Sequence, residues 1–188
     1  MKIAISGSTG TGKSTLAAAL AEKLSIPLIE ENYQPLYDAR VKGDFPPRLL
    51  TILRNKHTLE KAHSDFVTDR CPIDLMHLWL NQSGHKISRP LTNQFFELAL
   101  PQLQIYDFVI IPPWNSIQLQ QSTEALPRDL DIIEQLRHHA SILGHAYMWA
   151  PKIKIIEIPQ PITSLEARVD FVLEQIKKRR PELLQTAL

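Results

Sequence analysis

Residues 1–15 read MKIAISGSTGTGKST, a short apolar run followed directly by a glycine-rich segment. Residues 7–14 match G-x-x-x-x-G-K-[ST], the P-loop pattern, which is specific only where a strand precedes it and a helix follows. The β-branched residues Ile3 and Ile5 indicate the strand, and leucines at helical spacing indicate the helix: Leu16, Leu20 and Leu24. The stretch therefore predicts a strand, a phosphate-binding loop and a helix.

The chemistry of a nucleoside triphosphate explains why these residue types stand at this spacing. Glycines let backbone N–H groups converge on anionic oxygens, and the N-terminus of the following helix adds its positive dipole end. Lys13 is expected to reach the β- and γ-phosphates, Ser14 to ligate Mg²⁺, and Thr15 to lie near the α-phosphate. The predicted cofactors are therefore ATP and Mg²⁺, and the predicted nucleotide-binding residues are Gly7, Ser8, Thr9, Gly10, Thr11, Gly12, Lys13, Ser14 and Thr15.

Composition and charge argue against several classes of protein. The chain of 188 residues has a net charge of +1, which does not point to nucleic acid as a partner. Its 44% hydrophobic content suits a domain with a core, and no apolar run approaches the length of a membrane span. Cys71 is the single cysteine, and the chain begins in a predicted strand without a signal-peptide pattern. We therefore expect a cytoplasmic protein of one domain, residues 1–188, whose oligomeric state is open.

Strands alternate with helices along the rest of the chain. Apolar or alternating runs predict further strands at residues 27–31, 64–70, 107–111 and 152–158, with helices between them. This alternation predicts an α/β fold, in which a parallel sheet is covered by helices on both faces.

Three details of the helices are also predicted. Thr92 is expected to cap one helix, and Thr163 and Glu166 are expected to form a capping box before the last one. Residues 128–144 are expected to form a helix whose apolar positions face inward: Ile132, Ile133, Leu136, Ala140 and Leu143.

Charged residues end two of the predicted strands. Ligands of such sheets bind beyond the carboxyl ends of the strands, which gives these positions a functional interpretation. Asp69 would hold Mg²⁺ through water or accept a proton, and Arg70 would neutralise charge on a transferring phosphoryl group. A surface ion pair or a helix N-cap is the alternative for this pair.

Glu30 and Glu31 end the second predicted strand. Adjacent strand residues point to opposite faces, so one of the two is expected to enter the site, where it would orient a substrate hydroxyl or act as a base. Glu31 is favoured because it lies further past the strand, and a solvated pair of carboxylates is the alternative.

Residues 115–128 show only a weak pattern and are expected to form a lid. Arg128 follows this segment and opens a predicted helix, where closure would bring its guanidinium onto the phosphates. An ordinary surface arginine is the alternative.

On these residues the chain resembles small P-loop kinases. Thymidylate-kinase-like and deoxynucleoside-kinase-like enzymes carry a similar Asp-Arg pair after the third strand, as Asp69-Arg70 does here. The fullest likeness is to ribosylnicotinamide-kinase-like AAA-type domains, whose fourth strand is led by Tyr-Asp, as at Tyr106-Asp107. The resemblance implies a three-layer P-loop NTPase fold with five parallel strands in the order 2-3-1-4-5.

Motifs and resemblance together predict a kinase that moves the γ-phosphoryl group of ATP to a small molecule, a nucleoside or nucleotide. The predicted catalytic residues are Lys13, Glu31, Asp69, Arg70 and Arg128, and the predicted metal ligands are Ser14 and Asp69. The alternative is a nucleotide-binding or nucleotide-hydrolysing regulatory or assembly ATPase. Motor-type ATPases usually carry a water-activating glutamate after the metal-binding aspartate, where this chain has Arg70.

Overall fold

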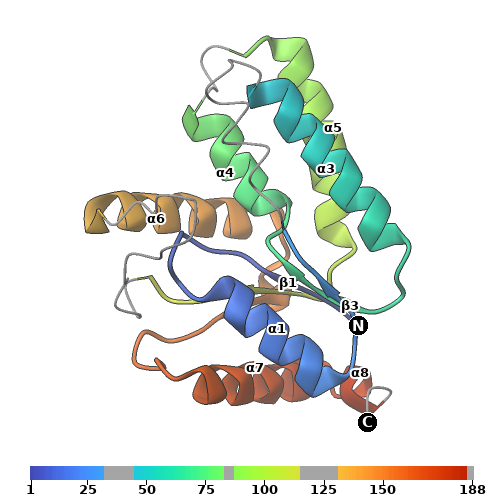
Figure 1. Ribbon diagram of the computed structural model, residues 1–188, viewed down its shortest axis with the longest axis vertical. Helices are drawn as coiled ribbons and strands as arrows, with labels where there is room; N and C mark the ends of the chain where they lie inside the picture. Colours follow the sequence, from blue (N-terminus) through green and yellow to red (C-terminus); the bar gives the residue numbers. More distant parts are fainter. Residues whose placement is uncertain (32–44, 83–86, 115–130, 186–188) are drawn as a thin grey trace.

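The computed structural model describes residues 1–31, 45–82, 87–114 and 131–185, and its centre is a sheet of five parallel strands (Figure 1). The strands lie in the order β2-β3-β1-β4-β5, as the resemblance implies. Their bounds are β1 Lys2–Ile5, β2 Leu28–Ile29, β3 Phe66–Asp69, β4 Phe108–Ile111 and β5 Ile155–Glu157. The expected order and the parallel arrangement are therefore confirmed, although each strand is shorter than the apolar run that predicts it.

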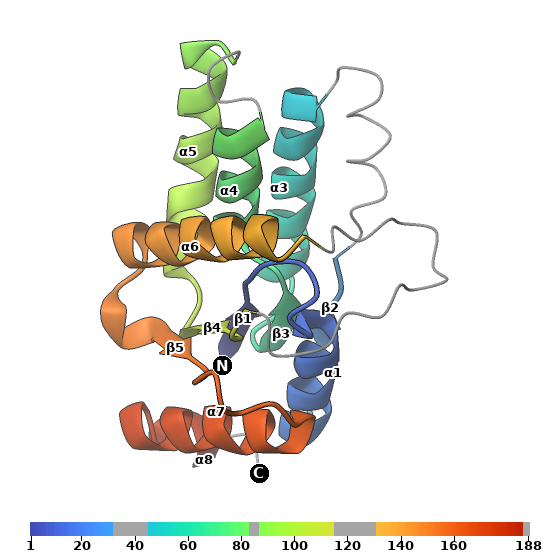
Figure 2. The same ribbon diagram turned by 90° about the vertical axis from the view of Figure 1, so that its left-hand side faces the viewer.

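Helices cover both faces of this sheet. Those among the described residues are α1 Lys13–Leu24, α3 Phe45–Lys61, α4 Pro72–Gln82, α5 Arg89–Gln104, α6 Ile132–Trp149, α7 Leu165–Arg179 and α8 Glu182–Gln185, with a 3₁₀ turn at Lys152–Lys154. Figure 2 shows α1 and α7 on one side of the strands and α3, α4, α5 and α6 on the other. The expected three-layer architecture is confirmed.

The alternation of side chains along each strand divides the core in two. On β1, Ile3 and Ile5 pack toward α1 and α7, whereas Ala4 faces the cluster built by α3, α4, α5 and α6. Central strands that are buried on both faces read as continuous apolar runs, which explains the FVII sequence of β4.

The helix predicted at residues 128–144 is displaced, and most of its predicted inward face is wrong, since Leu143 alone of the five predicted positions packs against the core. Asp131 caps α6 by accepting hydrogen bonds from the Ile133 and Glu134 amides, and the helix continues to Trp149. Ile133 is 66% exposed and Leu136 is 40% exposed, and Ile132 is also exposed. The inward face carries a polar residue among apolar ones, Gln135, Ile142 and Ala146, so a count of apolar positions alone selects the wrong side.

Both predicted caps are corrected by one residue or more. Helix α5 begins at Arg89 after Ser88, which places Thr92 inside the helix. The cap of α7 is Ser164, whose hydroxyl accepts a hydrogen bond from the Ala167 amide, so the Thr163–Glu166 box does not form the cap.

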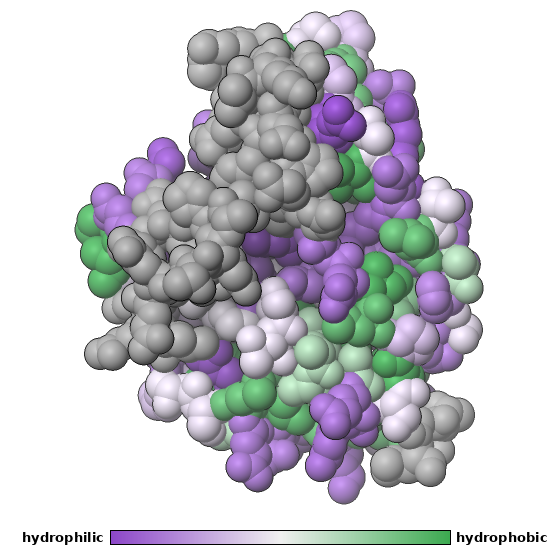
Figure 3. All heavy atoms as spheres, viewed as in Figure 1, coloured by the Kyte–Doolittle hydropathy of each residue, from purple (hydrophilic) through white to green (hydrophobic). Residues whose placement is uncertain are grey.

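On the face shown in Figure 3, hydrophilic and hydrophobic residues are interspersed over α1, α3 and α7. Across the described ranges, every helix is too short or too polar to cross a membrane.

Candidate active site

The glycine-rich loop joins the end of β1 to the start of α1. The Ser6 amide donates to the Ile110 carbonyl at 2.9 Å, which carries the pairing of β1 and β4 one residue past the strand. Gly10 and Gly12 then have φ angles of 76° and 79°, a left-handed region that side chains with a Cβ rarely adopt. The first hydrogen bond of α1 runs from the Leu16 amide to the Gly12 carbonyl. The two later glycines of the motif are therefore required by the backbone itself.

Lys13 is buried beneath this loop, with 5% of its surface exposed. Its Nζ donates a hydrogen bond to the Ser8 carbonyl at 2.5 Å, and the Thr11 hydroxyl donates to the same oxygen at 3.0 Å. The hydroxyls of Ser6 and Ser8 are buried and make no hydrogen bond to any described residue. A positive charge and polar groups thus converge on the loop, which suits an anionic ligand.

Ser14 and Asp69 meet at the carboxyl ends of β1 and β3. The Ser14 hydroxyl donates to Oδ2 of Asp69 at 2.5 Å, while Oδ1 of the same carboxylate is buried without a hydrogen bond to the described residues. A hydroxyl paired with a carboxylate that has an oxygen to spare fits Mg²⁺, which is bound by one or two protein oxygens together with phosphate and water. No cluster of three His, Cys, Asp or Glu side chains with ligand geometry occurs in the described part of the chain.

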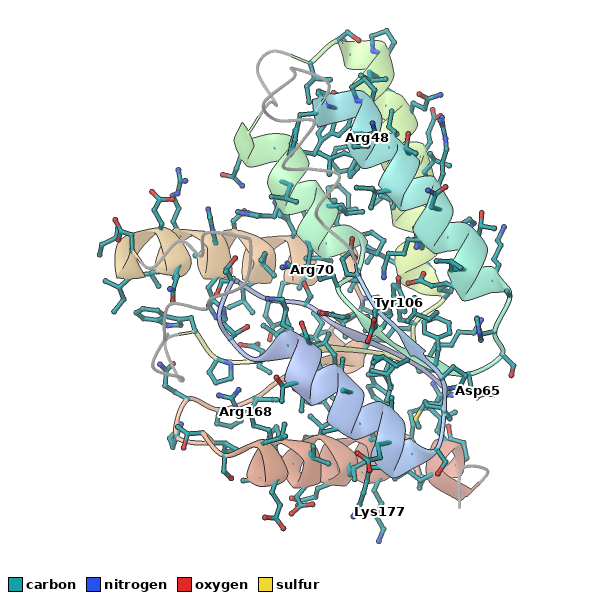
Figure 4. All side chains as sticks on the ribbon, viewed as in Figure 1. Arg48, Asp65, Arg70, Tyr106, Arg168 and Lys177 are labelled. Carbon is teal, nitrogen blue, oxygen red and sulfur yellow. The ribbon has the colours of Figure 1, made fainter. Side chains whose placement is uncertain are left out.

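Arg70 follows Asp69 with a φ angle of 72°, an unusual value for a residue with a side chain. Its amide donates to the Ile5 carbonyl at 2.8 Å, and its Nη1 lies 3.6 Å from Oδ1 of Asp74 (Figure 4). Such strained conformations persist where the surroundings fix them, often at functional sites.

Asp74 links the glycine-rich loop to the residues that follow β3, and it was not among the residues predicted from the sequence. Its carboxylate, 2% exposed, accepts hydrogen bonds from the Gly7 amide at 3.3 Å and the Cys71 amide at 3.0 Å, besides pairing with Arg70. Its signal in the sequence is an acid in the first turn of the helix that directly follows Asp69-Arg70.

Glu31 turns inward and Glu30 is exposed. Because Ile29 pairs with Thr68, Glu31 lies past the end of β2, on the same edge of the sheet as Asp69 and Arg70. The Glu31 side chain is 6% exposed, and its Oε2 lies 3.8 Å from the Nζ of Lys56.

Burial raises the pKa of Glu31 from 4.5 to about 7, since a charged carboxylate loses its hydration. The positive charges of Lys56 and Arg70 oppose this rise in pKa, and the negative charges of Asp74 and Asp69 add to it. A carboxylate with a pKa near neutrality is suited to accept and release a proton.

Arg168 supports the glycine-rich loop from the far end of the sequence and was also missed. It is 2% exposed, and it donates from Nη1 to the Thr11 carbonyl at 2.9 Å and from Nε to the Ile162 carbonyl at 3.1 Å (Figure 4). Arg168 and Thr11 are 157 residues apart along the chain, so no local pattern indicates the contact.

Two predicted features lie outside the described residues: Arg128, and the lid at residues 115–128. The remaining predicted residues are all described. Lys13 and Ser14 begin α1, after the loop that follows β1. Asp69 ends β3 and Arg70 follows it, and Glu31 lies two residues past the end of β2, the neighbour of β3 in the sheet.

Solved structures share this fold across nearly the whole chain. The deoxyadenosine kinase from M. mycoides with bound dATP has a TM-score of 0.63 at 17% identity and is covered over 100% of its length by 94% of this chain. The NadR protein in complex with NR has a TM-score of 0.63 at 15% identity, with 95% of this chain covering 50% of that one. The thymidylate kinase from Ehrlichia chaffeensis has a TM-score of 0.54 at 17% identity, with coverage of 93% and 97%. The resemblance to small P-loop kinases is thus confirmed at the level of the fold.

No curated protein is significantly similar to the chain in sequence. The family model described as "AAA domain" matches residues 2–157, which include the five described strands and the candidate site from Gly7 to Asp74, but not Arg168. The chain belongs to this AAA domain family.

Proposed function

We propose that the protein is an ATP-dependent phosphotransferase, a P-loop kinase that moves the γ-phosphoryl group of ATP to a hydroxyl or phosphate of a nucleoside or nucleotide. This proposal is supported by the spatial order of three groups at the ends of adjacent strands. The loop with Lys13 follows β1, the Ser14–Asp69 pair lies at the end of β3, and the buried Glu31 follows β2. The first two suit a triphosphate with its metal, and the third suits an acceptor. A deoxyadenosine kinase with bound dATP and a thymidylate kinase share the fold.

In this proposal Lys13 and the loop amides hold the β- and γ-phosphates, and Ser14 and Asp69 hold Mg²⁺. The ion, when bound, neutralises charge on the phosphate oxygens. Arg70, fixed by Asp74, faces the transferring group. Glu31 accepts the proton of the acceptor hydroxyl, whose oxygen forms a bond to the γ-phosphorus as the bond to the β,γ-bridging oxygen breaks and ADP leaves.

The test is ADP release from MgATP across a panel of nucleosides, nucleotides and ribosylnicotinamide. We expect release that rises with one acceptor class and is saturable in it. Steady release that no acceptor changes would instead support the hydrolytic ATPase, and nucleotide binding without release would support a regulatory protein.

Replacing Asp69 by Asn is expected to lower kcat/KM about 100-fold and to raise the Mg²⁺ concentration needed for half-maximal rate. The amide keeps an acceptor for the Ser14 hydroxyl but loses the charge that holds the metal. A MgCl₂ titration of ADP release measures both effects. Asp170→Asn, an exposed position on α7, is the control and should leave the titration unchanged.

Replacing Arg168 by Met is expected to weaken MgATP binding about tenfold, because the Thr11 carbonyl loses a buried donor and the loop loses its support. Isothermal titration calorimetry measures the affinity. Arg179→Met is the matched control, since Arg179 also donates from α7 to a backbone carbonyl, that of Ile155, at 2.6 Å, but not to the loop. Equal losses of affinity in the two variants would contradict the role of Arg168.

A further inference from the structure

A buried ionic network lies behind Glu31 and joins it to α3. The Nζ of Lys56, a residue only 6% exposed, lies 3.3 Å from Oε1 of Glu60 and 3.8 Å from Oε2 of Glu31, and it donates to the Thr68 hydroxyl at 2.5 Å. The Thr68 hydroxyl in turn donates to the Ile29 carbonyl at 3.3 Å, so the lysine is attached to both β3 and β2.

The two carboxylates of this network, those of Glu31 and Glu60, differ in the number of hydrogen bonds that they accept. Glu60 is completely buried and accepts hydrogen bonds from Nε2 of Gln102 at 2.7 Å and from the Tyr106 hydroxyl at 2.8 Å. Oε2 of Glu31 has no hydrogen-bond partner among the described residues. One ammonium therefore serves two carboxylates, and it lies closer to the one that already has neutral donors.

Because Glu31 lacks neutral donors at Oε2 among the described residues, its ionisation depends on the charges around it. In a buried site an opposite charge within about 4–6 Å is a major influence on whether a carboxylate ionises. The other charges that act on Glu31 come from the end of β3 and from α4: Asp69, Arg70 and Asp74. Arg70 is itself paired with Asp74, which reduces its influence and leaves Lys56 as the principal stabiliser of ionised Glu31.

We propose that Lys56 is a positioning residue for the transfer reaction: held by Glu60 and Thr68, its ammonium fixes the Glu31 carboxylate at the end of β2 and sets the fraction of it that is ionised at neutral pH. Glu60 moderates this effect by sharing the ammonium. The inference rests on the proposed function, in which Glu31 accepts the proton of the acceptor. It assigns to α3 an electrostatic part in the reaction besides its part in the core.

Two substitutions should move the titration of Glu31 in opposite directions. Lys56→Met removes the ammonium, so the midpoint of the acidic limb of kcat/KM should rise by about one pH unit, and kcat/KM at pH 6 should fall about tenfold below the wild-type value at the same pH. Glu60→Gln frees the ammonium for Glu31, so the same midpoint should fall. Lys61→Met, an exposed position in the last turn of α3, is the matched control and should leave it unchanged.

The ¹³C carboxyl resonance of Glu31, assigned by its loss in Glu31→Gln, reports the same titration without any acceptor. Opposite displacements in Lys56→Met and Glu60→Gln support the inference, because structural damage would not produce a fall in one variant and a rise in the other. An unchanged midpoint in both overturns it, even if the protein is an active kinase. Displaced resonances with no matching change in the kinetic limb would support the role of Lys56 and contradict Glu31 as the base.

Thermal unfolding checks that each variant folds. If Lys56→Met does not fold, Glu60→Gln and Lys56→Arg decide the matter. Lys56→Arg, which keeps the charge, should retain the wild-type midpoint, and Glu60→Gln should still lower it. A midpoint that does not fall in Glu60→Gln then overturns the inference.

Discussion

Lys13→Ala is expected to lower acceptor-dependent ADP release about 1,000-fold. The Lys13 ammonium is buried under the glycine-rich loop and is held in place by the Ser8 carbonyl, so no reorganisation is needed to receive a phosphate. Charge that develops on the γ-phosphoryl oxygens in the transition state would lose its buried cation, which water cannot replace. Steady-state ADP release at saturating MgATP and acceptor measures the loss.

The matched control is Lys23→Ala in the last turn of the same helix, where the side chain is exposed. It removes the same charge from α1 and should keep the wild-type rate. If Lys13→Ala retains more than about a tenth of that rate, an effect far below the loss expected for a transition-state donor, the loop is not the phosphate site.

Glu31→Gln is expected to lower kcat by about 100-fold or more, the usual contribution of a general base. The amide occupies the same volume past β2 but cannot accept a proton at neutral pH. In the wild-type protein the acidic limb of the kcat/KM profile should have its midpoint near the Glu31 pKa of about 7. The variant should lose this limb together with its activity.

The same substitution is expected to stabilise the protein above neutral pH. The pKa of Glu31 is about 7 in the folded protein and 4.5 in the unfolded chain, so the folded state binds the proton more tightly. The contribution of protonated Glu31 to the stability of the fold is fully present below pH 4.5 and is lost as the pH rises through about 7. The difference corresponds to about 3 kcal/mol at about 1.4 kcal/mol for each pH unit.

Urea unfolding at pH 5 and pH 8 measures this effect. Glu31→Gln should gain stability over the wild type at pH 8 and much less at pH 5. Glu30→Gln, its exposed neighbour, should show no such difference between the two pH values. A variant that is less stable than wild type at pH 8 would show that the Lys56 pairing outweighs the burial of Glu31.

The glycine-rich loop and the Asp69-Arg70 pair could be predicted because their spacing is fixed by local backbone geometry. The loop needs left-handed glycines beside a strand and a helix, and charged residues at a strand end mark the edge of the sheet. Alternation along a strand predicts only that one of Glu30 and Glu31 enters the site, and Glu31 is favoured because it lies further past the strand. Its burial beside Lys56 depends on α3, whose contacts the sequence does not state.

Asp74, Arg168 and Lys56 were all missed, but only for Arg168 does the local pattern give no sign. Arg168 reaches the loop from the last long helix, and its importance exists only in the folded chain. Lys56 and Glu60 did leave a sign, since they continue the inward stripe of α3 after Leu49 and Leu53. Charged residues at core positions of a helix indicate a buried network, and here that network adjoins the candidate base.

The most direct test of the central claim, that the phosphoryl group goes to a bound acceptor and not to water, is a reaction with MgATP and the best acceptor in H₂¹⁸O. The ³¹P spectrum distinguishes a phosphorylated acceptor without ¹⁸O from inorganic phosphate that carries it. We predict that the product is the phosphorylated acceptor, formed in equal amount with ADP and absent in Lys13→Ala. Labelled inorganic phosphate equal to the ADP formed, with the acceptor unchanged, would contradict the account and identify a hydrolase.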